Sequence, residues 1–160
     1  MELHTEILAV VKAFEDEGID YALCGGIALA IHGFPRFTKD VDFLVHPTDI
    51  DRMLAVLRPL GFIFKAIPLR FGANTANVRE IHRISKVEGE DTLTLDFILL
   101  SPLFDDAWRG REAVAWKART LRVVSRDGLV TMKRLAGRPQ DLADIAVLTA
   151  SSSLEDGANA

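Results

Sequence analysis

Cys24-Gly25-Gly26 is followed, after thirteen intervening residues, by Asp40-Val41-Asp42-Phe43-Leu44-Val45. The first motif is expected to turn a short strand into a helix, and the second has the pattern of a strand with two acids among apolar residues. Because alternate side chains of a strand point to the same face, we expect Asp40 and Asp42 to lie side by side. Two carboxylates in a buried run repel each other and resist desolvation, and a divalent cation between them removes both costs. The pair therefore indicates metal-dependent chemistry on a phosphate-bearing substrate.

A third acid, Asp96, stands in the apolar run Leu93-Thr94-Leu95-Asp96-Phe97-Ile98-Leu99-Leu100. If this strand lies beside the first acidic strand, three carboxylates converge. Such hard oxygen ligands suit one or two Mg²⁺ ions, which take their other ligands from water and substrate phosphates. Asp96 is also the candidate to help deprotonate an acceptor hydroxyl. Two simpler interpretations stay open: Asp40 as a strand-start residue that meets solvent, and Asp96 as an edge-strand acid that faces water.

Length and composition favour an ordinary globular domain. The chain has 160 residues and a net charge of −4, so general binding to duplex nucleic acid is not indicated, although a local basic patch remains compatible with an RNA end. Its one cysteine, Cys24, is expected to be a small buried hydrophobe in a reducing cytoplasm. No secretion signal and no run of about 20 apolar residues is found, so we expect no membrane partner.

The order of predicted elements is mixed. Helices are expected over residues 3–17, 27–31, 49–60, 126–137 and 139–148, and strands over 21–24, 40–45, 62–65, 69–71, 78–84, 92–100, 113–116 and 121–124. This order argues for an α+β fold with a mixed central sheet flanked by helices, rather than a regular βαβ array. Residues 1–150 are expected to form one domain, and the small polar residues of 151–160 a flexible C-terminal tail.

These motifs together resemble the three-part signature of the DNA polymerase β-type nucleotidyltransferase superfamily. The segment 24–33, with Arg36 and Thr38, is similar to its small bacterial members, which include the AbiEii-like toxin nucleotidyltransferases and related minimal enzymes. The segment 127–145 resembles the Lys…Arg-x-x-Asp-x-x-Asp ending of that group. The resemblance covers about residues 20–148 and implies a polymerase β-like nucleotidyltransferase fold.

The resemblance also implies a reaction: Mg²⁺-dependent transfer of a nucleoside monophosphate from an NTP, with ATP the expected donor, and release of pyrophosphate. Gly25 and Gly26 would hold the triphosphate, since glycines let the backbone approach a phosphate closely. Asp40, Asp42 and Asp96 would bind the metal and form the catalytic set. Taken alone, two glycines at this place are more typical of a tight strand-to-helix turn.

Further residues of the nucleotide-binding site are implied at five positions. Lys133 would reach the nucleotide phosphates as a mobile point charge, and Arg36 and Thr38 would touch them from the loop before the acidic strand. Arg138 and Asp141 lie three residues apart and share a helix face. Alternatively, Arg36 braces an aspartate, and Arg138 and Asp141 belong to a structural ion-pair network that anchors the last helix.

The acceptor is left open by the sequence: RNA, a protein or a small molecule such as an antibiotic. A toxin-like role would bring an antitoxin partner. Because the chain is short, the acceptor would be docked by a partner subunit or by a second copy of the chain. The rival function is a non-catalytic module of the same fold that binds a nucleotide or a partner, and the intact acidic set argues against it.

A basic cluster lies on the strand expected before Asp96. Its members are Arg79, His82, Arg83 and Lys86. The simpler interpretation is a solvated sheet face, and the alternative is a surface that steers a polyanionic acceptor.

Overall fold

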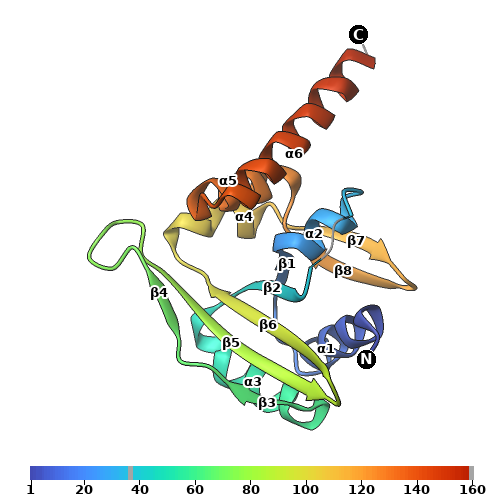
Figure 1. Cartoon of the computed structure of the whole chain (residues 1–160), viewed down its shortest axis with the longest axis vertical. Coiled ribbons are helices and arrows are strands. Elements are labelled where there is room, and N and C mark those ends of the chain that lie inside the picture. The colour runs from blue at the N-terminus through green and yellow to red at the C-terminus, as the bar shows by residue number, and fades with distance from the viewer. Residues whose placement is uncertain (36–37, 159–160) are drawn as a thin grey trace.

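The computed structural model describes residues 1–35 and 38–158, with side chains described as far as Ala150. Within these residues, eight strands form one mixed sheet (Figure 1). Their bounds are β1 Ala22–Cys24, β2 Asp40–Val45, β3 Phe62–Lys65, β4 Leu69–Phe71, β5 Arg79–Glu88, β6 Asp91–Leu99, β7 Glu112–Trp116 and β8 Arg119–Val123. The strand order is β3-β5-β6-β2-β1-β8-β7, and β4 also pairs with β5. The predicted α+β fold with a mixed sheet is confirmed.

Six α-helices of the described chain flank this sheet. They are α1 Leu3–Asp16, α2 Gly25–Ile31, α3 Ile50–Leu57, α4 Asp105–Arg109, α5 Arg126–Ala136 and α6 Pro139–Ala158. Short 3-10 turns cover Pro47–Asp49, Arg58–Leu60 and Pro102–Phe104. Figure 1 shows α1 and α3 near one end of the molecule, and α4, α5 and α6 together at the other.

The two faces of the central strands have different surroundings. On one face, the ring of Phe14 from α1 lies 5.5 Å from that of Phe43 and 6.1 Å from that of Phe97. Asp42 and Asp96 precede these phenylalanines by one residue, so their side chains project from the opposite face. Burial of the aromatic residues against α1 therefore fixes which way the acids point.

Two elements extend well beyond their predicted ends. The predicted strand 78–84 is a longer strand, Arg79–Glu88, because the hairpin with β6 stays paired as far as Glu88 and Asp91. The last helix does not end near residue 148 but continues to Ala158. Neither proline nor glycine interrupts this stretch before Gly157, and serine and alanine are compatible with helix. In Figure 1 this part of α6 extends away from the sheet.

Cys24 is fully buried at the end of β1, and burial raises the pKa of its thiol well above the ordinary value. The prediction of a small buried hydrophobe is confirmed. Trp108 and Trp116 are partly buried and pack against the core. Across the residues that the structure describes, we find no helix long and apolar enough to span a bilayer.

Candidate active site

Asp42 and Asp96 are direct neighbours on adjacent strands. β2 and β6 are parallel, and their register pairs Asp42 with Asp96 and Asp40 with Thr94. The strand adjacency that the sequence left conditional is therefore present. Two of the three predicted carboxylates stand side by side, and the third lies two residues along the same face of β2.

Gly25 explains why the glycine motif precedes the acidic strand. Its φ is +62°, a left-handed conformation that side chains rarely adopt. An added Cβ would overlap the Asp42 carboxylate and lie 2.8 Å from its Cγ. Because Cys24 pairs with Asp42 across β1 and β2, the backbone at Gly25 and the Asp42 carboxylate occupy neighbouring space. Gly25 is thus required for the placement of Asp42.

The Asp42 carboxyl group has a strongly perturbed pKa. Desolvation, followed by the charges of Asp96 and Asp40, raises its pKa from 3.8 to about 7, although Arg138 and Lys133 act in the opposite direction. Like charges and loss of water are the two costs that a bound cation removes. The chemistry and electrostatics of Asp40 and Asp42 therefore fit a hard divalent ion such as Mg²⁺.

Asp96 is buried and engaged by Arg83 from β5. The guanidinium donates from Nε to Oδ1 at 2.7 Å and from Nη2 to Oδ2 at 2.9 Å. This bidentate pair raises the pKa of Arg83. Within the described residues, no three acidic, histidine or cysteine side chains are placed together as a ready metal site. Asp96 as it stands fits a guanidinium, and it would serve as a metal ligand only if Arg83 turned away.

The loop before β2 contributes a local turn contact. Thr38 Oγ1 donates to the backbone carbonyl of Asp40 at 3.1 Å, which tightens the entry to the strand. Thr38 therefore supports the acidic strand directly, and its contact with a phosphate stays a prediction. Arg36 lies outside the described residues.

Ion pairs hold the corner between α5 and α6. The Lys133 ammonium is buried and lies 2.8 Å from Asp144 Oδ2, so it is not the mobile cation that was expected. Arg138 donates to the buried Asp141 carboxylate from Nε at 2.7 Å and from Nη2 at 3.2 Å, and most of the Arg138 side chain is exposed. Arg138 and Asp141 thus form the ion pair of the structural alternative, and contacts of Lys133 and Arg138 with a nucleotide stay predictions.

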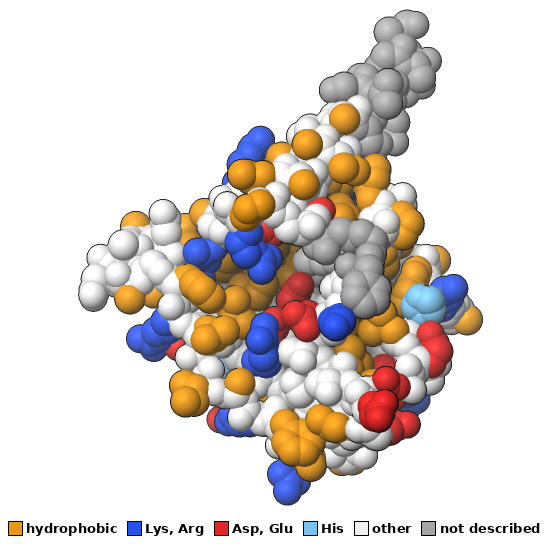
Figure 2. Space-filling view, in the orientation of Figure 1, with side chains coloured by type: hydrophobic (Ala, Val, Ile, Leu, Met, Phe, Trp, Pro, Cys, Tyr) orange, Lys and Arg blue, Asp and Glu red, His pale blue; other side chains and the backbone are white. Residues whose placement is uncertain are grey.

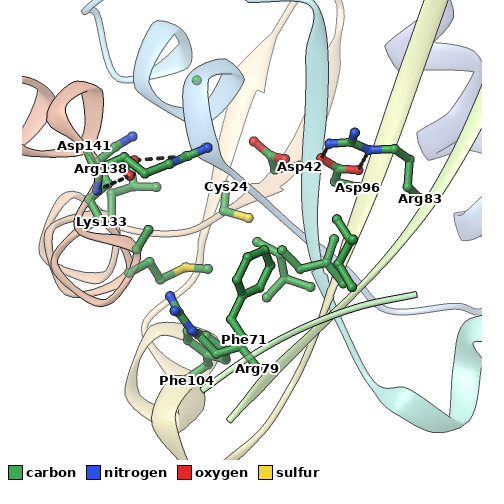
Figure 3. Close-up of a pocket in the computed structure, with 18 residues that line it drawn as sticks. Cys24, Asp42, Phe71, Arg79, Arg83, Asp96, Phe104, Lys133, Arg138 and Asp141 are labelled. Atoms are coloured by element: carbon green, nitrogen blue, oxygen red, sulfur yellow. Dashed lines mark hydrogen bonds and ion pairs between the residues drawn. The ribbon is translucent and has the colours of Figure 1, made fainter. Parts of the chain in front are cut away.

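A cavity of about 280 Å³ joins these parts. Figure 3 shows Asp42, Asp96 and Arg83 on one side, Lys133, Arg138 and Asp141 on another, and Phe71, Arg79 and Phe104 on a third. Figure 2 shows the same region as a hollow with acidic atoms at its centre and basic and apolar side chains around it. Gly25 and Gly26 line it as well.

Sequence reasoning missed the part that β4 and β5 play in the cavity. The basic cluster is not one solvated face, because Arg79 and Arg83 line the cavity while Lys86 pairs with Glu6 and His82 with Glu80. The signal was the strand alternation itself, which places residues 79, 81 and 83 on one face. Phe71 carried no such signal, since β4 has only three residues.

Comparisons with known proteins agree with this geometry. A family model described as "Uncharacterised nucleotidyltransferase" matches residues 1–153. Among solved structures, the lincomycin-bound lincosamide antibiotic adenylyltransferase LnuA matches with a TM-score of 0.60 and 16% identity, over 91% of this chain and 95% of that one.

A second match is ANT(2")-Ia in complex with adenylyl-2"-tobramycin, with a TM-score of 0.64 and 16% identity, over 95% of this chain and 90% of that one. At such identity the likeness shows the fold and leaves the substrate open. No curated protein matches the chain.

Proposed function

Because the chain belongs to the family described as uncharacterised nucleotidyltransferases, and is thus a nucleotidyltransferase, we propose that it transfers a nucleoside monophosphate from an NTP to a hydroxyl acceptor. The acceptor oxygen forms a bond to the α-phosphorus while the bond from that phosphorus to the bridging oxygen breaks. The electron pair leaves with pyrophosphate, and the hydroxyl proton passes to a carboxylate or water.

The observation that carries this proposal is the register of Asp42 and Asp96 together with the close packing of Gly25 on Asp42. Asp40 and Asp42 would hold one or two Mg²⁺ ions, which when bound supply charge neutralisation at the transferred phosphate. The catalytic contribution of this site is positioning and electrostatics, because phosphoryl transfer leaves little covalent chemistry to the protein.

The triphosphate would lie between Gly25 and Gly26 on one side and Lys133 and Arg138 on the other. The backbone at the two glycines carries no side chain that would keep a phosphate away. Arg138 is the better phosphate ligand of the two cations, since it is largely exposed at the cavity while Lys133 is held by Asp144. Asp141 then serves to orient Arg138.

Asp96 would accept the proton of the acceptor hydroxyl. Arg83 occupies one lone pair on each of its oxygens, and a carboxylate has further lone pairs for a proton or a hydroxyl donor. Arg83 thus orients Asp96 towards the cavity.

ATP is the proposed donor, since both solved relatives are described by adenylyl transfer or by an adenylyl product. The same descriptions support a small-molecule acceptor, because one structure is of a lincosamide antibiotic adenylyltransferase with lincomycin bound and the other contains adenylyl-2"-tobramycin. A toxin-like role with an antitoxin, membership of the AbiEii-like branch and a cytoplasmic location stay predictions from the sequence.

Isothermal titration with Mg²⁺ and each NTP tests the donor side directly. We expect Mg²⁺-dependent binding of an NTP, lost in Asp42→Asn and retained in Asp106→Asn, which removes an exposed acid on α4 that is not part of the cavity lining. Incubation with each α-labelled NTP, Mg²⁺ and cell extract then identifies the pool that gains label. No binding of any NTP to the folded protein would contradict the proposal.

The second candidate is a binding module without turnover, which the closed Arg83–Asp96 pair favours. It predicts that nucleotide-dependent function survives Asp42→Asn undiminished. Loss of that function together with loss of label transfer supports the enzyme instead.

A further inference from the structure

The sheet beside the two carboxylates is apolar. Ile98 lies on β6, two residues after Asp96. It pairs with Ile81 on β5, which in turn pairs with Leu69 on β4. All three line the cavity. At about 3.3 Å per residue, this row begins roughly 7 Å from the acidic row along the strand. A hydroxyl placed at Asp96 would therefore have an apolar floor within a few bonds of it.

Apolar side chains also form the walls above this floor. Phe71 on β4 presents its ring to the cavity, and Phe104 lies near it on the same side (Figure 3). Met132 on α5 also lines the cavity. Phe71 is 43% exposed, so its ring is accessible to a ligand in the cavity. Aromatic rings and a thioether in one cavity are well suited to a planar or aliphatic body, because they gain contact with it without demanding hydrogen bonds.

Arg79 closes the end of this apolar region. Its guanidinium lies 5.6 Å from the Phe71 ring centroid and its Nη1 donates to the Leu135 carbonyl at 2.8 Å. Its Nε is buried and has no hydrogen-bond partner among the described residues. Since a buried donor without a partner is costly, a ligand oxygen at this point would be stabilised.

The apolar region lies on the side of β2 away from the glycine motif. The strand order places β6, β5 and β4 on one side of β2 and β1, which leads into Gly25 and Gly26, on the other. The proposed triphosphate position is on the glycine side, and the apolar region is on the Asp96 side. The carboxylates lie between these two regions, so that a donor on one side and an acceptor on the other would both reach them, as a transfer reaction requires.

Charge narrows the class of acceptor. Three carboxylates line the cavity. Asp42 lies on β2, Asp96 is paired with Arg83, and Asp141 lies at the corner between α5 and α6. The apolar region itself is bordered by Arg79 and Arg83 and holds no described acidic side chain. Arg83 is already paired with Asp96, whereas Arg79 forms no ion pair with the described residues, so a polycationic acceptor would meet the Arg79 guanidinium without a compensating acid.

From these contacts we propose that the cavity between β4, β5, β6 and α5 is the acceptor subsite and takes a small, neutral or anionic alcohol with an apolar or aromatic body. This rests on the proposed function only for the transfer step, in which the alcohol oxygen attacks the α-phosphorus and pyrophosphate leaves. Binding of the alcohol itself needs no nucleotide.

Titration of the isotopically labelled protein by NMR tests this binding without any catalysis. The probes are phenyl β-D-glucopyranoside and methyl β-D-glucopyranoside, which share their hydroxyl groups and differ in the apolar body, and neamine as a polycation. We expect the phenyl glycoside to bind at least about tenfold more tightly than the methyl glycoside, from burial of the ring, and neamine not to bind.

A matched pair of variants locates the site. Phe71→Ser is expected to abolish the preference for the phenyl glycoside. Phe64→Ser removes an exposed ring from β3, outside the cavity lining, and should leave the preference unchanged. The affinity for Mg²⁺ and ATP should be the same in both variants, because the triphosphate lies on the glycine side.

The proposal is overturned if the two glycosides bind with equal affinity or if neamine binds more tightly than the phenyl glycoside. It is also overturned if Phe71→Ser weakens the binding of ATP rather than the binding of the phenyl glycoside. The last result would assign the apolar region to the base of the nucleotide. Failure of every NTP to bind, with the glycoside preference and its loss in Phe71→Ser intact, would refute the proposed function and leave this subsite standing.

Discussion

The backbone of Gly25 packs against the Asp42 carboxylate so closely that a methyl group at residue 25 would overlap that carboxylate. The φ of Gly25 is +62°, and a Cβ there would lie 2.8 Å from Asp42 Cγ and 3.0 Å from Asp42 Cβ. Since Asp42 is fixed in register between Cys24 and Asp96, it has little freedom to retreat. The glycine thus sets the position of the acid on which the proposed metal site depends.

Gly25→Ala is expected to weaken Mg²⁺ binding by at least about tenfold, roughly 1.4 kcal/mol, because the displaced carboxylate leaves its position beside Asp96. Titration calorimetry measures this. Gly18→Ala is the matched control, since Gly18 has a φ of +67° with nothing within 4 Å of an added Cβ. The control should show only the backbone strain, about 1 kcal/mol of stability, with unchanged metal binding. Equal effects in both variants would contradict the packing argument.

Asp42→Asn is expected to stabilise the metal-free protein at neutral and alkaline pH. Folding raises the pKa of Asp42 from 3.8 to about 7, so the native state binds the proton more tightly than the unfolded chain does. The contribution of the Asp42 carboxyl group to the free energy of unfolding is fully present below about pH 4 and is lost as the pH rises towards 7. At 1.36 kcal/mol per pKa unit the loss is at most about 4 kcal/mol.

Urea unfolding of both proteins in the presence of a chelator, from pH 4 to pH 8, measures the difference between them. The advantage of the asparagine variant should grow with pH and level off above about pH 7. Added Mg²⁺ should then stabilise the wild type and leave Asp42→Asn unchanged. A difference that stays constant across this range would be incompatible with a raised pKa.

Arg83→Gln is expected to increase Mg²⁺ affinity about tenfold and to lower the rate of label transfer. The bidentate pair holds both oxygens of Asp96, so its removal frees a third carboxylate for an ion while Asp96 loses its orientation. Arg70→Gln breaks an exposed pair with Glu80 on the neighbouring strand and serves as the control. Unchanged Mg²⁺ affinity in Arg83→Gln would show that Asp96 takes no part in the metal site.

Asp144→Asn is expected to lower the free energy of unfolding by about 3–5 kcal/mol, because it leaves the buried Lys133 ammonium without its carboxylate. Replacing both partners, as Lys133→Met with Asp144→Leu, should recover most of that loss. Asp16→Asn, which breaks the exposed pair with Lys12, should cost no more than about 0.5 kcal/mol. Denaturant unfolding distinguishes these outcomes, and a small loss in Asp144→Asn would mean that the corner is not held by this pair.

The local features of the site follow from the sequence. Alternation along Asp40-Val41-Asp42 places two acids on one face, and the strand-to-helix turn at Gly25 follows from the conformational freedom of glycine. The apolar run around Asp96 likewise predicts a buried strand. These signals are short-range, because they depend on the covalent spacing of residues within one element.

Pairings between elements were decided by the tertiary structure. The strand order puts Asp96 beside Asp42 and brings Arg83 to Asp96, and neither distance along the chain nor composition specifies that order. Lys133 was expected to be mobile and is instead buried with Asp144, since docking of α6 on α5 removes its solvent.

What the sequence by itself determined is therefore which residues can do chemistry: the two glycines and the three acids, set by strand alternation and backbone freedom. What only the tertiary structure decided is what each of them faces. Desolvation and charge at Asp42, the guanidinium on Asp96 and the apolar floor from Ile98 to Leu69 all arise where strands distant in sequence pair. Register and burial are properties of the assembled sheet, which no single segment carries.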